Sequence, residues 1–185
     1  MVKSKRLSAR EALIEAAFEV LSRNPGASLS RIAGFAGVGR ATLHRHFSSR
    51  QELLQKLTQQ ALQEMNEAAE QACVGVNSYS EALKKTLTAV IPLGDRYYFL
   101  TREPIEEDTE LKKAIGQQTR EMENLVNAAK DEGLFDSDIS TDWIVQAFDH
   151  LIYAAWECMR NETATPAQAS ELAWRTLTLG TGKRA

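Results

Sequence analysis

The stretch Leu29-Ser-Arg-Ile-Ala-Gly-Phe-Ala-Gly-Val-Gly-Arg-Ala-Thr-Leu-His-Arg-His-Phe47 decides the fold of the first part of this 185-residue chain. Its apolar residues recur at the spacing of one helical face, at Leu29, Ile32, Ala33 and Ala36. Gly37-Val38-Gly39 then interrupts, because glycine allows backbone turns that other residues avoid. A second short helical run follows, with Leu43 and Phe47 apolar. Two short helices joined by a tight turn predict a helix-turn-helix, whose second helix fits the major groove of DNA.

These residues resemble the DNA-binding module of the tetracycline-repressor (TetR) family of transcription regulators. The resemblance is carried by Ser28-Leu29-Ser30-Arg31-Ile32-Ala33, Ala36-Gly37-Val38-Gly39, Arg40-Ala41-Thr42-Leu43-His44-Arg45-His46-Phe47 and Ser48-Ser49-Arg50. Three positions depart from the family pattern. Gly39 replaces a serine and so lacks a hydroxyl cap, His44 replaces a tyrosine that commonly contacts phosphate, and Ala41 replaces a glycine. The resemblance implies a double-stranded DNA operator as partner, and the departures alter single contacts only.

Cationic and hydroxyl side chains on and beside the second helix are the predicted DNA contacts. Groove contacts are predicted for Arg40, Thr42 and Arg45, and phosphate contacts for Ser28, His44 and Arg50. Phosphate contacts position a protein on the duplex, whereas base contacts read its sequence. Arg50 begins a helix whose free N-terminal amides also favour a phosphate.

Charge is divided unevenly along the chain. Residues 1–50 carry a net charge of +6 and residues 51–185 a net charge of −9, within a total of −3. A basic head on an acidic body suits a head that approaches polyanions. No apolar run approaches the roughly 18 residues of a membrane span, and the basic N-terminus lacks the apolar segment of a secretory signal. The expected protein is soluble and cytoplasmic, without a membrane partner.

Helical periodicity runs through the rest of the chain, and no segment has the pattern of a strand. Beyond the helix-turn-helix, the predicted helices span about 8–24, 49–76, 80–91, 95–101, 107–132, 140–161 and 165–180. Together with the two short helices, these make about nine, which predicts an all-α protein. The predicted division is an N-terminal three-helix DNA-binding domain at residues 1–48, followed by a larger ligand-binding and dimerisation bundle at 49–185.

The segment 141–161 is apolar on more than one face, so it must be covered on both sides. One side can meet its own bundle and the other a second copy of the chain. In the resembled family the last two helices form a four-helix dimer interface. The predicted homodimer interface therefore lies on these helices, at Leu151, Ala155, Met159, Leu172, Ala173 and Leu177.

The resemblance also implies a ligand cavity inside the body. Its candidate lining residues are Tyr97, Tyr98, Phe99, Arg102, Met122, Trp143, Phe148 and His150. Arg102 and His150 are the predicted polar anchors of a small apolar or aromatic ligand. The competing interpretation is that most of these aromatics are ordinary core residues, and that His150 is a core or interface histidine.

Motifs for catalysis, metals and cofactors do not fit their required contexts. The glycines at 34–39 have the wrong spacing for a dinucleotide loop and follow no strand. His44 and His46 do not share a helical face, and no third metal ligand accompanies them. Two interpretations remain, neither of them an enzyme. One is a repressor released from a palindromic operator by a ligand, and the other is a TetR-like DNA-binding protein whose body makes protein contacts or organises DNA.

Overall fold

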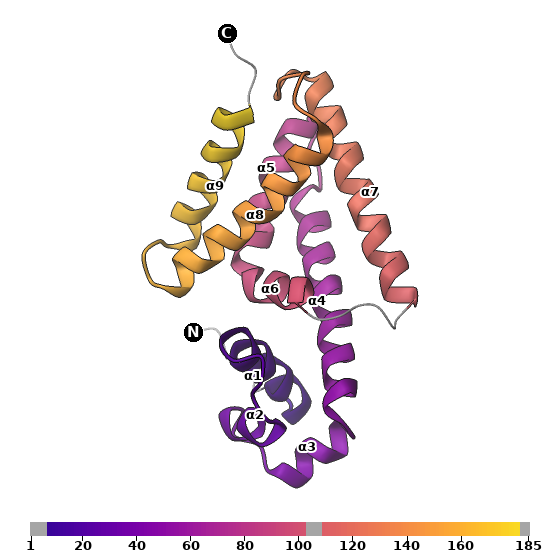
Figure 1. Cartoon of the computed structure of the whole chain (residues 1–185), viewed down its shortest axis with the longest axis vertical. Coiled ribbons are helices and arrows are strands. Elements are labelled where there is room, and N and C mark those ends of the chain that lie inside the picture. Colours follow the sequence, from indigo (N-terminus) through magenta and orange to yellow (C-terminus); the bar gives the residue numbers. More distant parts are fainter. Residues whose placement is uncertain (1–6, 103–108, 182–185) are drawn as a thin grey trace.

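The computed structural model describes residues 7–102 and 109–181, apart from the side chains of Tyr98, Thr101, Arg102 and Thr181. The regular structure within these ranges is helical, as the sequence predicts (Figure 1). The elements are α1 Ala9–Arg23, α2 Leu29–Phe35, α3 Arg40–His46, α4 Arg50–Ala72, α5 Tyr79–Val90, the 3-10 helix η1 Ile91–Leu93, α6 Gly94–Arg102, α7 Thr109–Asp131, α8 Thr141–Arg160 and α9 Pro166–Thr181. Among the described residues, no helix is long and apolar enough to cross a lipid bilayer.

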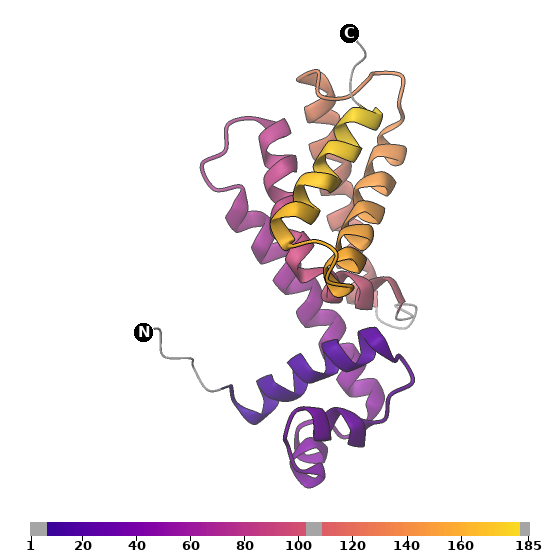
Figure 2. The same cartoon turned by 90° about the vertical axis from the view of Figure 1, so that its left-hand side faces the viewer.

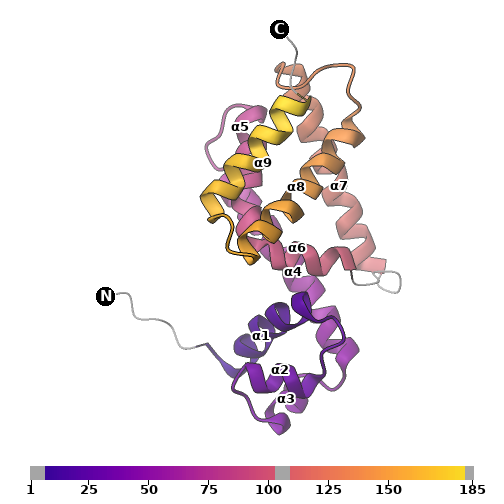
Figure 3. The same ribbon diagram turned by 60° about the vertical axis from the view of Figure 1, so that its left-hand side comes forward.

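Helices α1, α2 and α3 form a small head below the rest of the chain (Figures 1 and 3). Ser8 begins α1 with the predicted capping box, because its backbone N–H donates to Glu11 at 2.7 Å and its hydroxyl accepts from the Glu11 N–H at 3.2 Å. Gly37, at φ 65°, provides the turn between α2 and α3. The Val38 N–H then closes the end of α2 on the Ala33 carbonyl at 2.9 Å.

Helix α4 joins the head to the body without an intervening loop (Figure 2). Its first half belongs to the head, since Leu53, Leu57 and Ala61 are buried in one core cluster with α1, α2 and α3. Its second half belongs to the body, where Met65 joins the other core cluster. The helix ends at Ala72 rather than near residue 76, because the chain turns sharply through Gly75 at φ 74°.

Two details of the middle of the chain differ from the sequence-based prediction. Helix α5 is capped by Ser78 and not by Ser80, because the Ser78 hydroxyl accepts from the Glu81 N–H at 3.3 Å while Ser80 already lies within the first turn of the helix. The Pro92 segment ends α5 as predicted but opens no loop. The chain passes through η1 directly into α6, which keeps α6 beneath the body and next to the head (Figure 1).

The body is built around α8, whose buried side chains face α5, α7 and α9. Its core cluster contains Ile144, Phe148 and Ile152 of α8 together with Leu87 of α5 and Val126 of α7. Each fully buried aliphatic or aromatic side chain contributes about 1.5–3 kcal/mol of transfer free energy. This second core is separate from the core of the head, and α4 and α6 contribute to both.

Candidate DNA-binding surface and ligand cavity

Helix α3 lies at the end of the molecule away from the body (Figures 1 and 3). Leu43 and the following Phe47 are buried in the head core and hold the helix against it. The charged side chains take the opposite side: Arg40, His44 and Arg45 are exposed and Thr42 is half-buried. Gly39, which precedes α3, has no side-chain cap, as expected from the missing serine. This arrangement leaves a basic helix face free for a polyanion.

The Arg50 side chain is held within the head. Its guanidinium donates to the Ala27 carbonyl at 2.6 Å and to the Pro25 carbonyl at 2.5 Å. It therefore ties the start of α4 to the loop between α1 and α2. A phosphate would have to compete with these two carbonyls for Arg50. Sequence reasoning missed this role because the partners are 23 and 25 residues away.

The start of α4 is also satisfied from within the chain. Ser49 caps the helix as predicted, accepting from the Glu52 N–H at 3.1 Å. The Glu52 carboxylate accepts from the Ser48 N–H at 2.7 Å and the Ser48 hydroxyl at 2.6 Å, and these hydrogen bonds lower its pKa. A carboxylate thus stands where the sequence suggests a phosphate. Ser28 likewise caps α2, accepting from the Arg31 N–H at 3.3 Å.

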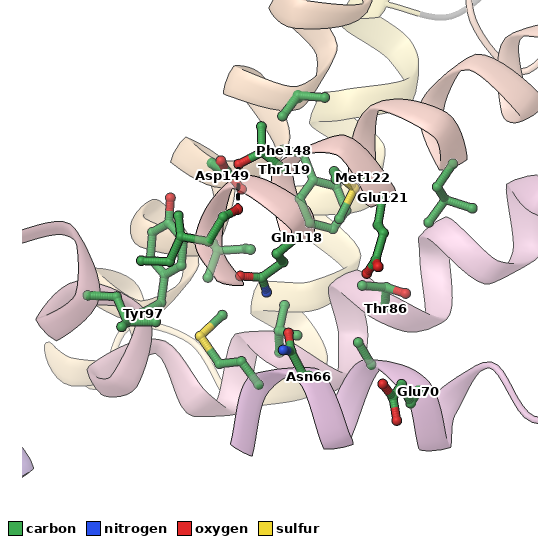
Figure 4. Close-up of a pocket in the computed structure, with 18 of the residues that line it drawn as sticks. Asn66, Glu70, Thr86, Tyr97, Gln118, Thr119, Glu121, Met122, Phe148 and Asp149 are labelled. Carbon is green, nitrogen blue, oxygen red and sulfur yellow. Dashed lines mark hydrogen bonds between the residues drawn. The ribbon is translucent and has the colours of Figure 1, made fainter. Parts of the chain in front are cut away.

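A cavity of about 470 Å³ lies inside the body (Figure 4). Helices α4, α5, α6, α7 and α8 all contribute to its walls. Its apolar and aromatic lining is Met65, Ala69, Val90, Tyr97, Leu100, Ile115, Met122, Leu125, Val145, Phe148 and Ile152, and its polar lining is Asn66, Glu70, Cys73, Thr86, Gln118, Thr119, Glu121 and Asp149. This volume is in the range of cavities that enclose small ligands.

Three of the predicted ligand-binding residues, Tyr97, Met122 and Phe148, line this cavity. Three others do not. Phe99 is buried against Phe18 of α1, with ring centroids 5.6 Å apart and an interplanar angle of 89°. Trp143 is 64% exposed, and the exposed His150 ring lies 2.8 Å from the Gln146 carbonyl.

Helical geometry explains these placements. Consecutive residues are about 100° apart around a helix, so Tyr97 and Phe99 face in nearly opposite directions. The aromatic run on α6 is therefore divided between the cavity and the head. His150 is turned away from the cavity next to Asp149 for the same reason. The side chains of Tyr98 and Arg102 lie outside the described residues.

Sequence reasoning missed the polar residues of the cavity, Asp149 above all. Burial raises the pKa of Asp149 to about 6, partly offset by the charge of His150. Burial, together with the negative charge of Asp149, raises the pKa of Tyr97 well above its ordinary value. The available signal was a carboxylate on the apolar face of α8, four residues after Val145 and three before Ile152.

The predicted dimer residues are distributed differently from expectation. Ala155, Ala173 and Leu177 are buried in the chain's own core, where α8 and α9 pack together, and Leu151 and Met159 are partly buried against that core. Leu172 is 53% exposed. Exposed apolar surface on these helices is found at the predicted Leu172 and also at Trp143, Tyr153 and Leu179. Most of the apolar residues of α8 and α9 are thus buried within the core of a single chain.

Arg96 of α6 connects the head to the body. Its guanidinium donates to Glu15 of α1 at 2.5 Å and to Glu64 of α4 at 2.9 Å, and it also pairs with Asp95. It lies over the Phe18 ring, 4.5 Å from the centroid. Burial lowers the pKa of Arg96, but the charge of Asp95 and the hydrogen bonds to Glu15 and Glu64 raise it above its ordinary value.

Comparison with known proteins identifies relatives of this chain. Residues 13–57 match the family model described as bacterial regulatory proteins, tetR family. The chain is 30% identical over 153 residues to the HTH-type transcriptional repressor LfrR of Mycolicibacterium smegmatis, covering 82% of this chain and 79% of LfrR.

Solved structures agree with this match. The crystal structure of LfrR from Mycobacterium smegmatis in complex with proflavine has a TM-score of 0.76 at 28% identity, covering 95% of this chain and 97% of that one. The ketosteroid transcriptional regulator KstR2 of Mycobacterium tuberculosis shares the fold, with a TM-score of 0.78, 17% identity and full coverage of both chains. This chain therefore belongs to the TetR family of DNA-binding transcription regulators.

Proposed function

We propose that this protein is a homodimeric repressor that binds a near-palindromic DNA operator and is released from it by an aromatic small molecule. The observation that carries the proposal is the combination of an exposed basic α3 at one end of the molecule and a ligand-sized cavity in the body. Helices α4 and α6 contribute to both the head core and the cavity. A shift of either helix on ligand binding would therefore also move the head.

DNA recognition is assigned to the exposed face of α3. Arg40, Thr42 and Arg45 reach into the groove, and His44 and Ser28 lie toward the phosphates. Two copies related by a two-fold axis present two such helices to half-sites about one helical turn apart or slightly more. Selection of bound sequences from random duplex DNA should return an operator with inverted half-sites. Recovery of sequences without any common motif would contradict sequence-specific regulation.

The contributions of single side chains to DNA binding can be separated by measuring how the DNA affinity depends on salt concentration. Replacing a phosphate-contacting residue lowers the magnitude of the salt slope by about 0.9 and weakens all sequences alike. Replacing a base-reading residue costs about 1–3 kcal/mol at one position of the site and relaxes specificity there. We expect His44→Ala to show the first behaviour and Arg45→Ala the second. Lys112→Ala, an exposed cation on α7, is the matched control and should change neither.

Dimerisation is assigned to the exposed face of α8 and α9. Trp143 and Leu172 are more than half exposed in the single chain, and Leu179 is 79% exposed. Large apolar side chains gathered on two adjacent helices favour association over solvation. Obligate interfaces of this kind commonly bury more than about 2,000 Å².

Ligand release is assigned to the cavity. The related LfrR has been solved with proflavine, a planar aromatic molecule, and Tyr97, Phe148 and Met122 here offer apolar contacts to a molecule of that type. Reversing an operator-binding equilibrium from 99:1 to 1:99 requires a ligand preference of about 5.5 kcal/mol between the two states.

The test is a pair of titrations, one of ligand binding to the free protein and to the operator-bound protein, and one of operator binding with and without ligand. By linkage, the factor by which the ligand weakens operator binding must equal the factor by which the operator weakens ligand binding. A ligand that fills the cavity without changing operator affinity would argue for the alternative, a body that serves protein contacts.

A further inference from the structure

The cavity in the body is acidic as well as apolar. Three carboxylates, Glu70, Glu121 and Asp149, are among its lining residues, and none of the described lining residues is Lys, Arg or His. Figure 4 shows Tyr97 and Asp149 toward one end of the cavity and Glu70 and Glu121 toward the other. Glu70 and Glu121 are exposed to solvent, whereas Asp149 is half-buried. The exposed pair thus marks the mouth and Asp149 the interior.

Asp149 carries its charge at a cost. Because burial raises its pKa only to about 6, the carboxylate is ionised at neutral pH in surroundings that solvate it poorly. The neighbouring Tyr97 phenol stays neutral, so it does not add a second negative charge. An ionised group in an apolar site is stabilised by the opposite charge of a counter-ion that occupies the site in place of water.

The side chains around Asp149 suit a flat aromatic group. Phe148 and Tyr97 present rings to the cavity, and Met65 and Met122 present polarisable thioethers. Aromatic rings and a carboxylate both favour a delocalised cation, the rings through their negative faces and the carboxylate through its charge. The rings and the carboxylate disfavour an aromatic anion of the same shape as the cation.

We infer that the cavity selects an aromatic cation, with the half-buried Asp149 as its counter-ion and Glu70 and Glu121 attracting it at the mouth. This inference rests on the proposed ligand-binding function and adds the charge class of the ligand. Asp149 contributes most of the discrimination, because the two glutamates at the mouth are screened by water and salt.

The test compares two probes of nearly equal shape, the permanent cation N-methylacridinium and acridine, which is neutral at about pH 8 where Asp149 is ionised. Isothermal titration calorimetry measures the affinity of each for the full-length protein. We expect the wild type to bind N-methylacridinium about tenfold or more tightly than acridine. Asp149→Asn, which keeps size and loses charge, should remove this preference by weakening the cation while leaving acridine nearly unchanged.

Matched variants locate the effect. Glu121→Gln removes a carboxylate of the mouth and should reduce the cation preference only about twofold, less so at high salt. Ile115→Trp narrows the cavity from the partly exposed α7 side and should weaken both probes. Asp149→Asn is expected to fold, because it removes a charge whose burial is unfavourable, and thermal unfolding at about pH 8 checks this.

Three outcomes overturn the inference: equal binding of the two probes by the wild type, no binding of either, or a cation preference that survives in Asp149→Asn. Failure of the proposed function is a different result. In that case N-methylacridinium binds with the Asp149-dependent preference but leaves the affinity for the selected operator unchanged. Induction by this cation would then be refuted while the charge selectivity of the cavity would stand.

Discussion

One carboxylate holds the start of α5 against the end of α7. Glu132 accepts from the Tyr79 N–H and the Ser80 N–H, both at 2.8 Å, from the Ser80 hydroxyl at 2.7 Å and from the Ser78 hydroxyl at 3.0 Å. The hydrogen bonds from Ser80, then Tyr79 and Ser78, lower the pKa of Glu132 to about 2. Glu132 thus satisfies free amides of one helix from a position just beyond another.

We predict that Glu132→Gln lowers the melting temperature at neutral pH. The folded pKa lies below the ordinary value, so the ionised carboxylate stabilises the fold above about pH 4.5, and this contribution is lost as the pH falls through about 2. The melting-temperature difference between wild type and variant should therefore shrink on acidification over that window. A difference that stays constant from pH 6 to about pH 2 would refute the role of the charge.

At the scale of elements, the start of α6 lies in close contact with α8. A β-carbon placed on Gly94 would overlap the Trp156 side chain, so only glycine allows the start of α6 to lie against α8 at this point. The reason is space and not backbone conformation, since Gly94 has an ordinary helical φ of −61°. This contact places α6 so that Tyr97 reaches the cavity and Phe99 reaches the head.

We predict that Gly94→Ala destabilises the protein by about 1–3 kcal/mol, the usual cost of overpacking. Gly34→Ala is the matched control, because a β-carbon at this α2 position meets nothing within 4 Å. The control should stabilise by up to about 1 kcal/mol through helix propensity. Chemical denaturation measures both. Equal effects of the two substitutions would mean that α6 and α8 are not in the close contact described.

At the scale of the whole molecule, the head and the body meet through α4 and α6. Arg96 is 13% exposed, and its pairs with Glu15 and Glu64 span α1, α4 and α6. The adjacent residue on α6, Tyr97, lines the cavity. If the proposed ligand displaces α6, these contacts would carry the displacement to α1 and to the long α4, so the proposed release of DNA would have two connected routes.

We predict a coupling free energy between Glu15 and Arg96 of about 0.5–3 kcal/mol in a double-mutant cycle of Glu15→Gln and Arg96→Met. The exposed pair Glu81 and Lys85 is the control, with side chains 54% and 45% exposed. Its cycle should give about 0.3–0.5 kcal/mol, as for other exposed pairs one helical turn apart. Denaturant unfolding provides the free energies. Equal coupling in the two cycles would deny Arg96 a special role in joining head and body.

The dimer prediction also belongs to this scale. Leu172→Glu places a charge on the exposed α9 face and should separate the proposed dimer into folded monomers, measured by analytical ultracentrifugation at micromolar concentration. Ala173→Glu is the contrasting variant, because Ala173 is 4% exposed within one chain and its replacement should unfold the protein. A folded monomeric wild type, or a dimer unaffected by Leu172→Glu, would contradict the assignment of this face.

The sequence alone determined the helices, the glycine turn and the basic head, because their causes are local. The apolar spacing at Ile32 and Leu43, the capping box at Ser8 and the turn at Gly37 are each local signals. Each depends only on residues a few positions away in the sequence. The family resemblance followed from the same short segment. The cavity that the resemblance implies also led to Tyr97, Met122 and Phe148 as candidate ligand residues, although the sequence did not show that they meet in one cavity.

Only the tertiary structure decided which faces of those helices meet. Arg50 is held by carbonyls of the α1–α2 loop, Asp149 faces the cavity, and Ala173 packs inside the monomer. Each of these depends on partners more than ten residues away, whose positions the periodicity of one helix does not contain. An apolar stripe states that a face must be buried. What buries it, whether the chain's own core, a ligand or a second copy, is set by the packing of all the helices together.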